Sequence, residues 1–188
     1  MTTKQSTILI PGRINPRVRS RVEAEFDAVT IDAADAALLD SEVRARISGI
    51  ASATTIDAGF IDAFPNLKII ANFGVGYDIV DARHAATRGV MVTNTPDVLT
   101  DEVANLGVGL ALALTREIPK ADAYVREGRW LKRDMALNRS IVGRPVGVVG
   151  LGRIGLATAD RLAALGAKVS WHGPRSKPDA PYPYDPDL

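Results

Sequence analysis

Residues 146–155 read Val-Gly-Val-Val-Gly-Leu-Gly-Arg-Ile-Gly, an apolar run that leads directly into the pattern G-x-G-x-x-G. In such a pattern the first glycine permits a tight turn out of a strand, the second leaves space beside a pyrophosphate, and the third lets a helix pack closely on the strand. We expect the helix over 154–165 and a second strand over 167–171. The order strand, glycines, helix and strand predicts a dinucleotide site, because the helix start offers N–H groups and a positive dipole end to phosphates. The alternative is an ordinary glycine-rich turn. The candidate cofactor-binding residues of this loop are Gly150, Leu151, Gly152, Arg153, Ile154 and Gly155.

The residues after the second strand favour NADP(H) over NAD(H). An NAD site usually has an acidic residue at the end of this strand, where it accepts hydrogen bonds from the ribose. The corresponding position, 23 residues after Gly150, is Gly173. The side chains of Arg175, Ser176 and Lys177 follow it, and they suit a 2′-phosphate through charge-assisted hydrogen bonds. The alternative is that Arg175 and Lys177 are ordinary solvated loop charges.

The first hundred residues alternate short apolar runs with helical patterns. Strands are expected near 7–10, 28–31, 49–53, 67–71 and 90–93. Helices are expected to begin near Pro16, Asp57 and Asp81, with a weaker helix over 38–47. Because apolar strands that alternate with helices are typical of a parallel sheet covered on both faces, this half is predicted to be a flavodoxin-like α/β layer structure.

A different pattern follows Pro96. The residues Thr100, Asp101 and Glu102 are expected to cap a long helix that is interrupted near Pro119 and continues to Gly128. Residues 129–144 are expected to form a loop. The tail over 174–188 contains five prolines, which exclude regular structure and predict a disordered or linker segment.

Composition excludes several classes of function. The net charge of +1 provides no basic field for nucleic acid or an anionic membrane, so neither partner is expected. The chain has no cysteine, and its two histidines, His84 and His172, are too few and too scattered for a metal site. The N-terminus lacks the pattern of a secretory signal, and the most apolar stretch, 106–114, is far shorter than the ~20 residues of a membrane span. We therefore expect a cytoplasmic protein.

Three further segments accompany the glycine loop: LKIIANFGVGYD over 67–78, RGVMVTNTPDVLTDEVA over 88–104, and VREGRW over 125–130. Together they resemble the D-isomer-specific 2-hydroxyacid dehydrogenase family. The missing acid at Gly173 and the tail Tyr182-Pro183-Tyr184 are most similar to the glyoxylate/hydroxypyruvate reductase branch. The resemblance implies a flavodoxin-like substrate domain over 1–98 and the first part of a Rossmann dinucleotide-binding domain over 99–188.

The resemblance also assigns roles. It implies that backbone N–H groups of Gly74, Val75 and Gly76 hold the substrate carboxylate, although a plain glycine-rich turn is the alternative. It places Thr100 beside the nicotinamide end of the cofactor, a role compatible with simple helix capping. The helix from Asp101 corresponds to the dimer-forming helix of the family, so a homodimer is expected. Trp130 corresponds to an aromatic side chain that reaches the partner subunit's substrate pocket, and the alternative is a tryptophan used only in packing.

The activity implied is NADPH-dependent reduction of a small 2-keto acid, of the glyoxylate or hydroxypyruvate type, to the D-2-hydroxy acid by hydride transfer. The catalytic arginine and the histidine–glutamate pair of the family lie beyond the point that matches Leu188, so no catalytic residue is expected in these 188 residues, and the chain alone is expected to be inactive. A sheet of this kind needs more strands than the 33 residues after Gly155 supply. We therefore expect these 188 residues to be the front part of a longer enzyme. The alternatives are a genuine short protein without catalysis and a fold that a second, separate piece completes. The alternative functions are a non-catalytic dinucleotide-binding or dimerisation module, and a 2-hydroxyacid dehydrogenase of the phosphoglycerate or formate type.

Overall fold

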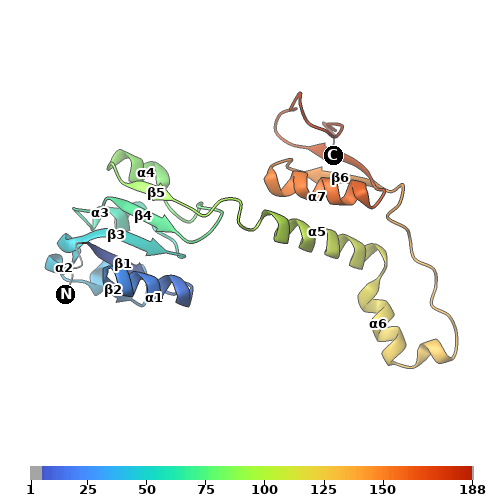
Figure 1. The fold of residues 1–188 in the computed structure, drawn as a ribbon, viewed down its shortest axis with the longest axis horizontal. Helices are drawn as coiled ribbons and strands as arrows, with labels where there is room; N and C mark the ends of the chain where they lie inside the picture. Colours follow the sequence, from blue (N-terminus) through green and yellow to red (C-terminus); the bar gives the residue numbers. More distant parts are fainter. Residues whose placement is uncertain (1–5, 188) are drawn as a thin grey trace. The chain divides into compact units, whose positions relative to one another are not determined.

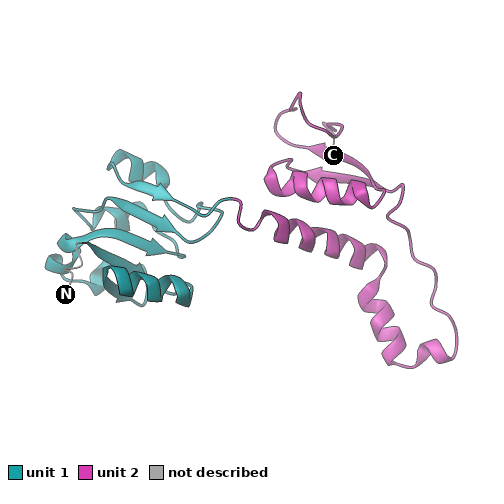
Figure 2. Cartoon of the chain, viewed as in Figure 1, with its two compact units in different colours: residues 1–96 teal, residues 97–188 magenta. Residues whose placement is uncertain are grey.

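The computed structural model describes residues 6–187. The chain divides into two compact units, 1–96 and 97–188 (Figure 2). Both units combine helices with parallel strands, which confirms the predicted α/β class. No helix among residues 6–187 has the length and apolar character needed to cross a membrane.

Unit 1 is built on a five-stranded parallel sheet with the order β2-β1-β3-β4-β5 (Figure 1). Its strands are β1 (Thr7–Pro11), β2 (Asp27–Ile31), β3 (Ile47–Ser52), β4 (Ile69–Asn72) and β5 (Met91–Thr93). The five predicted strands are thus present, and their order is that of flavodoxin-like folds. The register places Ile50 opposite Ile70 on neighbouring strands, and both side chains are buried because helices cover the sheet.

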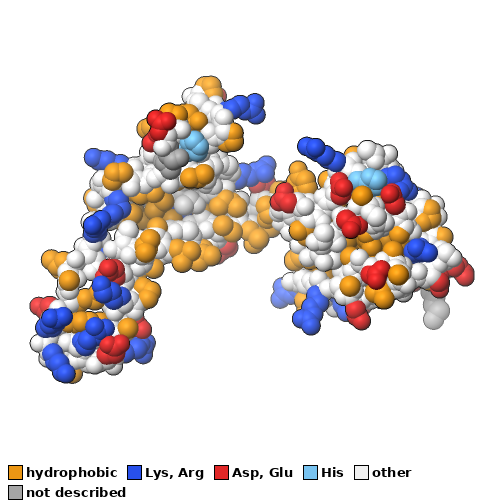
Figure 3. All heavy atoms as spheres, turned by 180° about the vertical axis from the view of Figure 1, so that it is seen from behind, with side chains coloured by type: hydrophobic (Ala, Val, Ile, Leu, Met, Phe, Trp, Pro, Cys, Tyr) orange, Lys and Arg blue, Asp and Glu red, His pale blue; other side chains and the backbone are white. Residues whose placement is uncertain are grey.

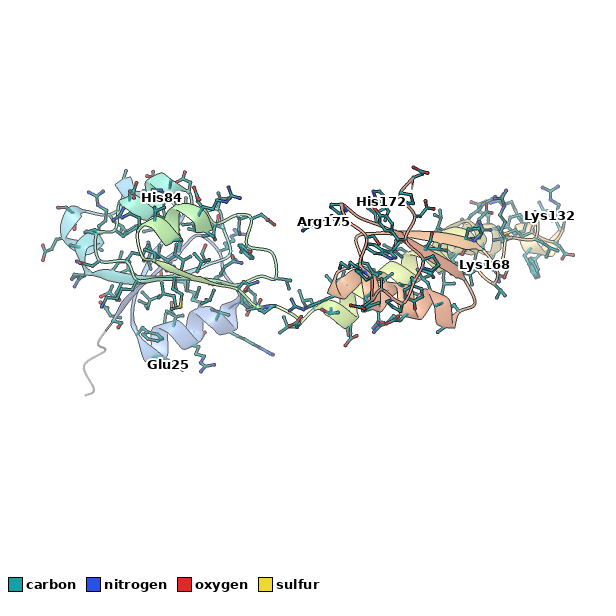
Figure 4. All side chains as sticks on the ribbon, turned by 90° about the horizontal axis from the view of Figure 1, so that it is seen from above. Glu25, His84, Lys132, Lys168, His172 and Arg175 are labelled. Atoms are coloured by element: carbon teal, nitrogen blue, oxygen red, sulfur yellow. The ribbon has the colours of Figure 1, made fainter. Side chains whose placement is uncertain are left out.

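Four α-helices and one 3₁₀ turn connect these strands. They are α1 (Pro16–Glu25), η1 (Ala36–Leu38), α2 (Ser41–Arg46), α3 (Ala58–Asp62) and α4 (Ala82–Thr87). The view in Figure 4 shows α1 on one side of the sheet and the later helices of the unit on the other. The predicted caps at Asp57 and Asp81 are confirmed: their carboxylates accept the N–H of Phe60 at 2.8 Å and of His84 at 2.9 Å.

The single helix predicted over 38–47 was wrong. The chain instead forms η1, a break at Leu39, and the short helix α2. Asp40 explains the break, because its side chain accepts the N–H of Val43 at 2.8 Å and so starts a new helix. Ile47, expected at the helix end, is the first residue of β3 and is fully buried.

Unit 2 contains two paired parallel strands and a helix between them in sequence. These are β6 (Pro145–Val149), α7 (Arg153–Ala164) and β7 (Lys168–His172). The long helix α5 (Thr100–Thr115) packs against α7, and Arg161 of α7 donates to Asp101 at 2.7 Å and to Asn105 at 2.8 Å. The strand–helix–strand unit predicted around the glycine loop is therefore confirmed.

The long helix of this unit lacks the predicted side-chain cap at its start, but it is interrupted near Pro119 as predicted. No side chain caps α5, because Thr100 lies inside the first turn and its N–H bonds to the carbonyl oxygen of Asp97 at 3.1 Å. The expected side-chain cap at Thr100–Glu102 was therefore wrong. The helix ends at Thr115, and α6 (Ile118–Arg126) begins after Glu117, which has a left-handed φ of 48°. Pro119 is tolerated because it sits in the first turn of α6, where no helical N–H bond is lost.

The tail also differs from the prediction. The segment Tyr182–Asp185 does not form a disordered linker, because it packs along β7 against Trp171, a residue that is only 1% exposed. The prolines do prevent a further regular element over 174–187. The loop predicted over 129–144 is present, with one 3₁₀ turn, η2 (Arg129–Leu131), at its start.

The start of α7 approaches the turn after β6 so closely that only glycine fits. A Cβ at Gly155 would overlap the carbonyl oxygen of Gly150, and Val148 is also within contact distance at 3.5 Å. Gly152 is the opposite case, because a Cβ there would have no atom within 4 Å. The two glycines therefore serve different purposes: Gly155 permits packing, whereas Gly152 leaves open space.

We expect Gly155→Ala to lower the free energy of unfolding by about 1–3 kcal/mol, because the helix start or the turn must shift to admit the methyl group. The matched control is Gly152→Ala, which should lose no stability, since its backbone has φ −83° and ψ −167° and its surroundings are open. Urea unfolding followed by circular dichroism measures both. Equal losses for the two variants would contradict this reading of the turn.

Candidate functional site

The glycine loop lies at the carboxyl edge of the paired strands in unit 2. The register pairs Val149 with His172, so the residues that follow β6 and β7 lie side by side. Gly150 has a φ of 90°, a left-handed value that side chains rarely adopt, and its N–H donates to the carbonyl oxygen of His172 at 2.8 Å. The carboxyl edge of a parallel sheet is where ligands bind in open α/β folds.

The loop leads into a helix start that has no side-chain cap. Gly152 is the N-cap of α7, and no side-chain hydrogen bond caps this 12-residue helix. Within residues 6–187, no hydrogen bond involves the N–H of Arg153 or Ile154. Unpaired N–H groups, the positive end of the helix dipole and the open space at Gly152 together make an anion-binding geometry.

The segment after β7 lies next to this loop. The Nζ atom of Lys177 donates to the carbonyl oxygen of Leu151 at 2.6 Å and lies 5.8 Å from the ring centroid of Trp171. Figure 4 shows Arg175 near His172, at the end of β7 opposite Lys168. The structure thus brings residues 150–155 and 175–177 to one edge, with Lys177 bound to the loop backbone and Arg175 exposed.

The start of α5 is tied to the same helix start. The carboxylate of Asp97 forms an ion pair with Arg153 at 2.8 Å, and the carbonyl group of Asp97 accepts the N–H of Thr100. Thr100 is half-buried in the first turn of α5. The role implied for Thr100 beside the nicotinamide end of the cofactor stays a prediction. Trp130 lies in η2 on the surface of unit 2 and is 54% exposed.

The second predicted loop, 74–76, follows β4 in unit 1. The buried side chain of Asn72 donates from Nδ2 to the carbonyl oxygen of Gly76 at 2.9 Å and to that of Gly74 at 3.4 Å. The Nδ2 atom of Asn94 donates to the carbonyl oxygen of Val75 at 2.7 Å. All three carbonyl groups of the loop are therefore held by side-chain amides.

This arrangement leaves backbone donors of the loop available. No hydrogen bond within residues 6–187 involves the N–H of Val75 or of Gly76, whereas the N–H of Gly74 bonds to the carbonyl oxygen of Asn72 at 3.1 Å. Successive backbone N–H groups bind an anion where the chain turns them toward one point. Of the three residues predicted for a carboxylate, two thus present free donors, and Gly74 serves the internal geometry of the loop.

The sequence interpretation missed Asn72 and Asn94. Both lie inside the segments quoted for the family resemblance, but no spacing rule connects them to the 74–76 loop. The available signal was an amide at the end of each of two apolar strand runs, since the carboxyl ends of parallel strands meet at one edge. The Oδ1 atom of Asn72 is buried and has no hydrogen-bond partner within the described residues, whereas its Nδ2 atom bonds to the 74–76 loop.

Each of the two histidines, which are labelled in Figure 4, has a hydrogen-bond partner in the protein. His84 bonds through Nε2 to Oδ1 of Asp62 at 2.8 Å, and Arg88 contacts the same oxygen. The hydrogen bond from His84, and the weaker contribution of Arg88, hold the pKa of Asp62 below its usual value. His172 bonds through Nδ1 to the carbonyl oxygen of Asp185 at 2.9 Å. Among residues 6–187 there is no cluster of three or more His, Cys, Asp or Glu that could hold a metal ion.

Comparisons with known proteins find enzymes of similar sequence. Hydroxyphenylpyruvate reductase from Plectranthus scutellarioides is 48% identical over 128 residues, and glyoxylate/hydroxypyruvate reductase A from Arabidopsis thaliana is 43% identical over 132 residues. These alignments cover 68% and 70% of this chain but only 41% and 42% of the two enzymes.

A solved structure is also similar over nearly the whole chain. It is an NADPH-dependent glyoxylate/hydroxypyruvate reductase from Sinorhizobium meliloti in complex with NADP and malonate, with a TM-score of 0.86 and 47% identity. The match covers 97% of this chain and 57% of that enzyme, so the chain spans little more than half of it. Residues 8–169 match the family described as D-isomer specific 2-hydroxyacid dehydrogenase, catalytic domain. The chain therefore belongs to the D-isomer specific 2-hydroxyacid dehydrogenase family.

Proposed function

We propose that unit 2 binds NADP(H) at the glycine loop, and that these two units serve an enzyme that reduces a small 2-keto acid of the glyoxylate or hydroxypyruvate type to the D-2-hydroxy acid. The observation that carries the proposal is the uncapped start of α7, where the N–H groups of Arg153 and Ile154 have no partner among residues 6–187 and lie beside the open space at Gly152. This donor set suits the diphosphate of a dinucleotide. When bound, the reduced cofactor supplies the hydride that the keto carbon accepts.

The preference for NADP(H) is supported by charge at the carboxyl edge. Gly173 offers no carboxylate to the ribose, and the exposed Arg175 has no ion pair or hydrogen bond within residues 6–187. Arg175 and Ser176 are therefore free to meet a 2′-phosphate. Lys177 adds positive charge nearby while its ammonium group holds Leu151. The Sinorhizobium relative was solved with NADP, which supports the same preference here.

We propose the 74–76 loop as the binding site for the substrate carboxylate. The side-chain amides of Asn72 and Asn94 hold its carbonyl groups, and this leaves the N–H groups of Val75 and Gly76 to donate. Backbone donors suit a carboxylate because they have fixed positions and carry no counter-charge that must be desolvated. The relative from Sinorhizobium was solved with malonate, which is itself a carboxylate.

Reduction of a keto acid also needs a general acid that protonates the oxygen as the hydride arrives. Neither histidine of this sequence is assigned that role. His84 lies on α4, outside the segments that carry the family resemblance, and His172 lies at the end of β7, where its Nδ1 bonds to the backbone of Asp185. We propose that the arginine and the histidine–glutamate pair of the family supply this chemistry in a protein that carries them, and that the 188-residue chain alone is inactive.

We further propose a homodimer formed through α5. One side of this helix packs in the core of unit 2, whereas Leu106, Leu110 and Leu114 are 63%, 62% and 80% exposed. They recur every four residues and so form one stripe, and hydrophobic side chains are visible along this helix in Figure 3. A second copy of the helix would bury this stripe. We also propose, from the family resemblance, that the exposed Trp130 reaches the substrate pocket of the partner subunit.

The cofactor assignment is tested by Gly152→Val. Two methyl groups in the open space at Gly152 should block the diphosphate and abolish NADPH binding in isothermal titration calorimetry, while the melting temperature stays unchanged because no protein atom lies nearby. Normal NADPH affinity in the variant would refute the site.

The reaction is tested by NADPH oxidation with glyoxylate and hydroxypyruvate, followed at 340 nm. Turnover is expected only from a protein that also carries the arginine and the histidine–glutamate pair. If such a protein turned over neither acid, the proposed substrate class would be refuted.

The 2′-phosphate assignment is tested by Arg175→Ala. Loss of its charge-assisted hydrogen bonds should weaken NADPH binding by about 1–3 kcal/mol and leave NADH binding unchanged. Dissociation constants of both cofactors should be measured at one ionic strength, with Arg139→Ala as the control for a general loss of positive charge. An equal loss for NADPH and NADH in the Arg175 variant would disprove the assignment.

A further inference from the structure

The tail of unit 2 forms a third extended segment along β7. The N–H of Trp171 donates to the carbonyl oxygen of Pro183 at 2.9 Å, and the N–H of Asp185 donates to the carbonyl oxygen of Trp171 at 2.8 Å. These bonds make a parallel bridge between Trp171 and Tyr184. Because β6 occupies the other edge of β7, residues 174–181 become a loop that leaves the end of β7 and returns to the same strand.

Three side-chain hydrogen bonds close this loop. The hydroxyl group of Tyr184 donates to the carbonyl oxygen of Gly173 at 2.9 Å, and the indole Nε1 of Trp171 donates to the carbonyl oxygen of Tyr182 at 3.1 Å. The hydroxyl group of Tyr182 donates to Oδ1 of Asp160 on α7 at 2.7 Å. Burial, and secondarily the contact with Asp160, raises the pKa of Tyr182 to about 12, so its hydroxyl remains a donor at neutral pH.

The side chain of Tyr184 contacts His172 and Gly173, the residues from which the loop 174–181 begins. Its ring meets Trp171 edge-to-face with centroids 4.9 Å apart, and it stacks on His172 at 6.1 Å. Its hydroxyl group holds the carbonyl oxygen of the peptide bond between Gly173 and Pro174. That peptide plane and the fixed φ of Pro174 set the direction in which Arg175 leaves the strand.

The loop 174–181 is also bonded to the glycine loop, the proposed binding site of the cofactor. Lys177 donates to the carbonyl oxygen of Leu151 in the glycine loop at 2.6 Å. Arg175 and Ser176 therefore lie between two anchors, Tyr184 at Gly173 and Lys177 at Leu151, although both residues are themselves exposed. A loop that is held before the ligand arrives loses less conformational freedom on binding, and this raises affinity.

We propose that Tyr184 is a positioning residue for cofactor selectivity, which holds Arg175 and Ser176 at the 2′-phosphate through its bond to the Gly173 carbonyl group. The inference rests on the proposed binding of NADP(H) by this chain. Tyr184 would thus affect selectivity without touching the phosphate itself. Without its hydrogen bond, the additional affinity that the 2′-phosphate gives NADPH over NADH falls, while the contacts that both cofactors share persist.

The test is Tyr184→Phe, which removes one hydroxyl group and keeps the ring. Dissociation constants should be measured by calorimetry for NADPH and NADH, and for the fragments adenosine 2′,5′-bisphosphate and 5′-AMP, which need only the adenine end of the site. The preference for the 2′-phosphorylated member of each pair should fall about fivefold, the equivalent of one hydrogen bond of about 1 kcal/mol. An unchanged preference in both pairs would overturn the positioning role.

The matched control is Tyr124→Phe. Its hydroxyl group also donates to a backbone carbonyl oxygen in unit 2, that of Arg133 at 2.9 Å, but it lies outside the loop. It should lose similar stability and keep the full preference for the 2′-phosphate. An equal drop in this control would overturn the proposal, because the effect would then be general destabilisation.

A second variant covers the case in which Tyr184→Phe does not fold. Tyr182→Phe removes only the bond to Asp160, since the Trp171 contact uses the backbone of Tyr182. It should reduce the same preference, and full preference in a folded Tyr182→Phe would count against an anchored loop. Absence of NADPH and NADH binding by the wild-type chain would instead overturn the proposed function, whereas wild-type binding with an unchanged Tyr184→Phe preference overturns the positioning role alone.

Discussion

The approach of α7 to the turn after β6 is the constraint on which unit 2 depends. Because Gly155 has no side chain, the helix can begin directly over Gly150, and its first N–H groups face the open space at Gly152. Helix starts usually satisfy such groups with a capping side chain, and this one has none. The ion pair between Asp97 and Arg153 and the bonds from Arg161 to α5 then fix the helix against its neighbour.

Both candidate sites offer free backbone N–H groups as donors, but the surrounding structure differs between them. In each, backbone N–H groups are left without protein partners because neighbouring structure engages the other polar groups. In unit 1 the amides of Asn72 and Asn94 hold the carbonyl groups of the 74–76 loop. In unit 2 the carbonyl groups of α7 are used within the helix, and the first N–H groups remain free. Under the proposed function, both loops would bind their anions mainly through backbone N–H groups, with few charged side chains required.

Much of the fold was predictable because it depends on local pattern. Apolar runs such as Ile69–Asn72 predicted the strands, and the glycine pattern after Val149 predicted the strand–helix–strand unit of unit 2. The failures depend on contacts between distant residues. Nothing near Tyr184 in the sequence indicates that it would bridge to Trp171, and the role of Asn94 follows from its contact with Val75, 19 residues away. The split at Asp40 was a local signal that was overlooked, since aspartate before a helix is a strong cap.

The most direct measurement is an NMR titration of the ¹⁵N-labelled 188-residue chain with NADPH, in which every backbone amide reports its own environment. If free N–H groups at the start of α7 bind the diphosphate, the largest shifts will fall on Gly152, Arg153 and Ile154, with smaller shifts at Arg175 and Ser176. Binding accompanied by shifts confined to other regions, or no shift at millimolar NADPH, would contradict dinucleotide binding at this helix start.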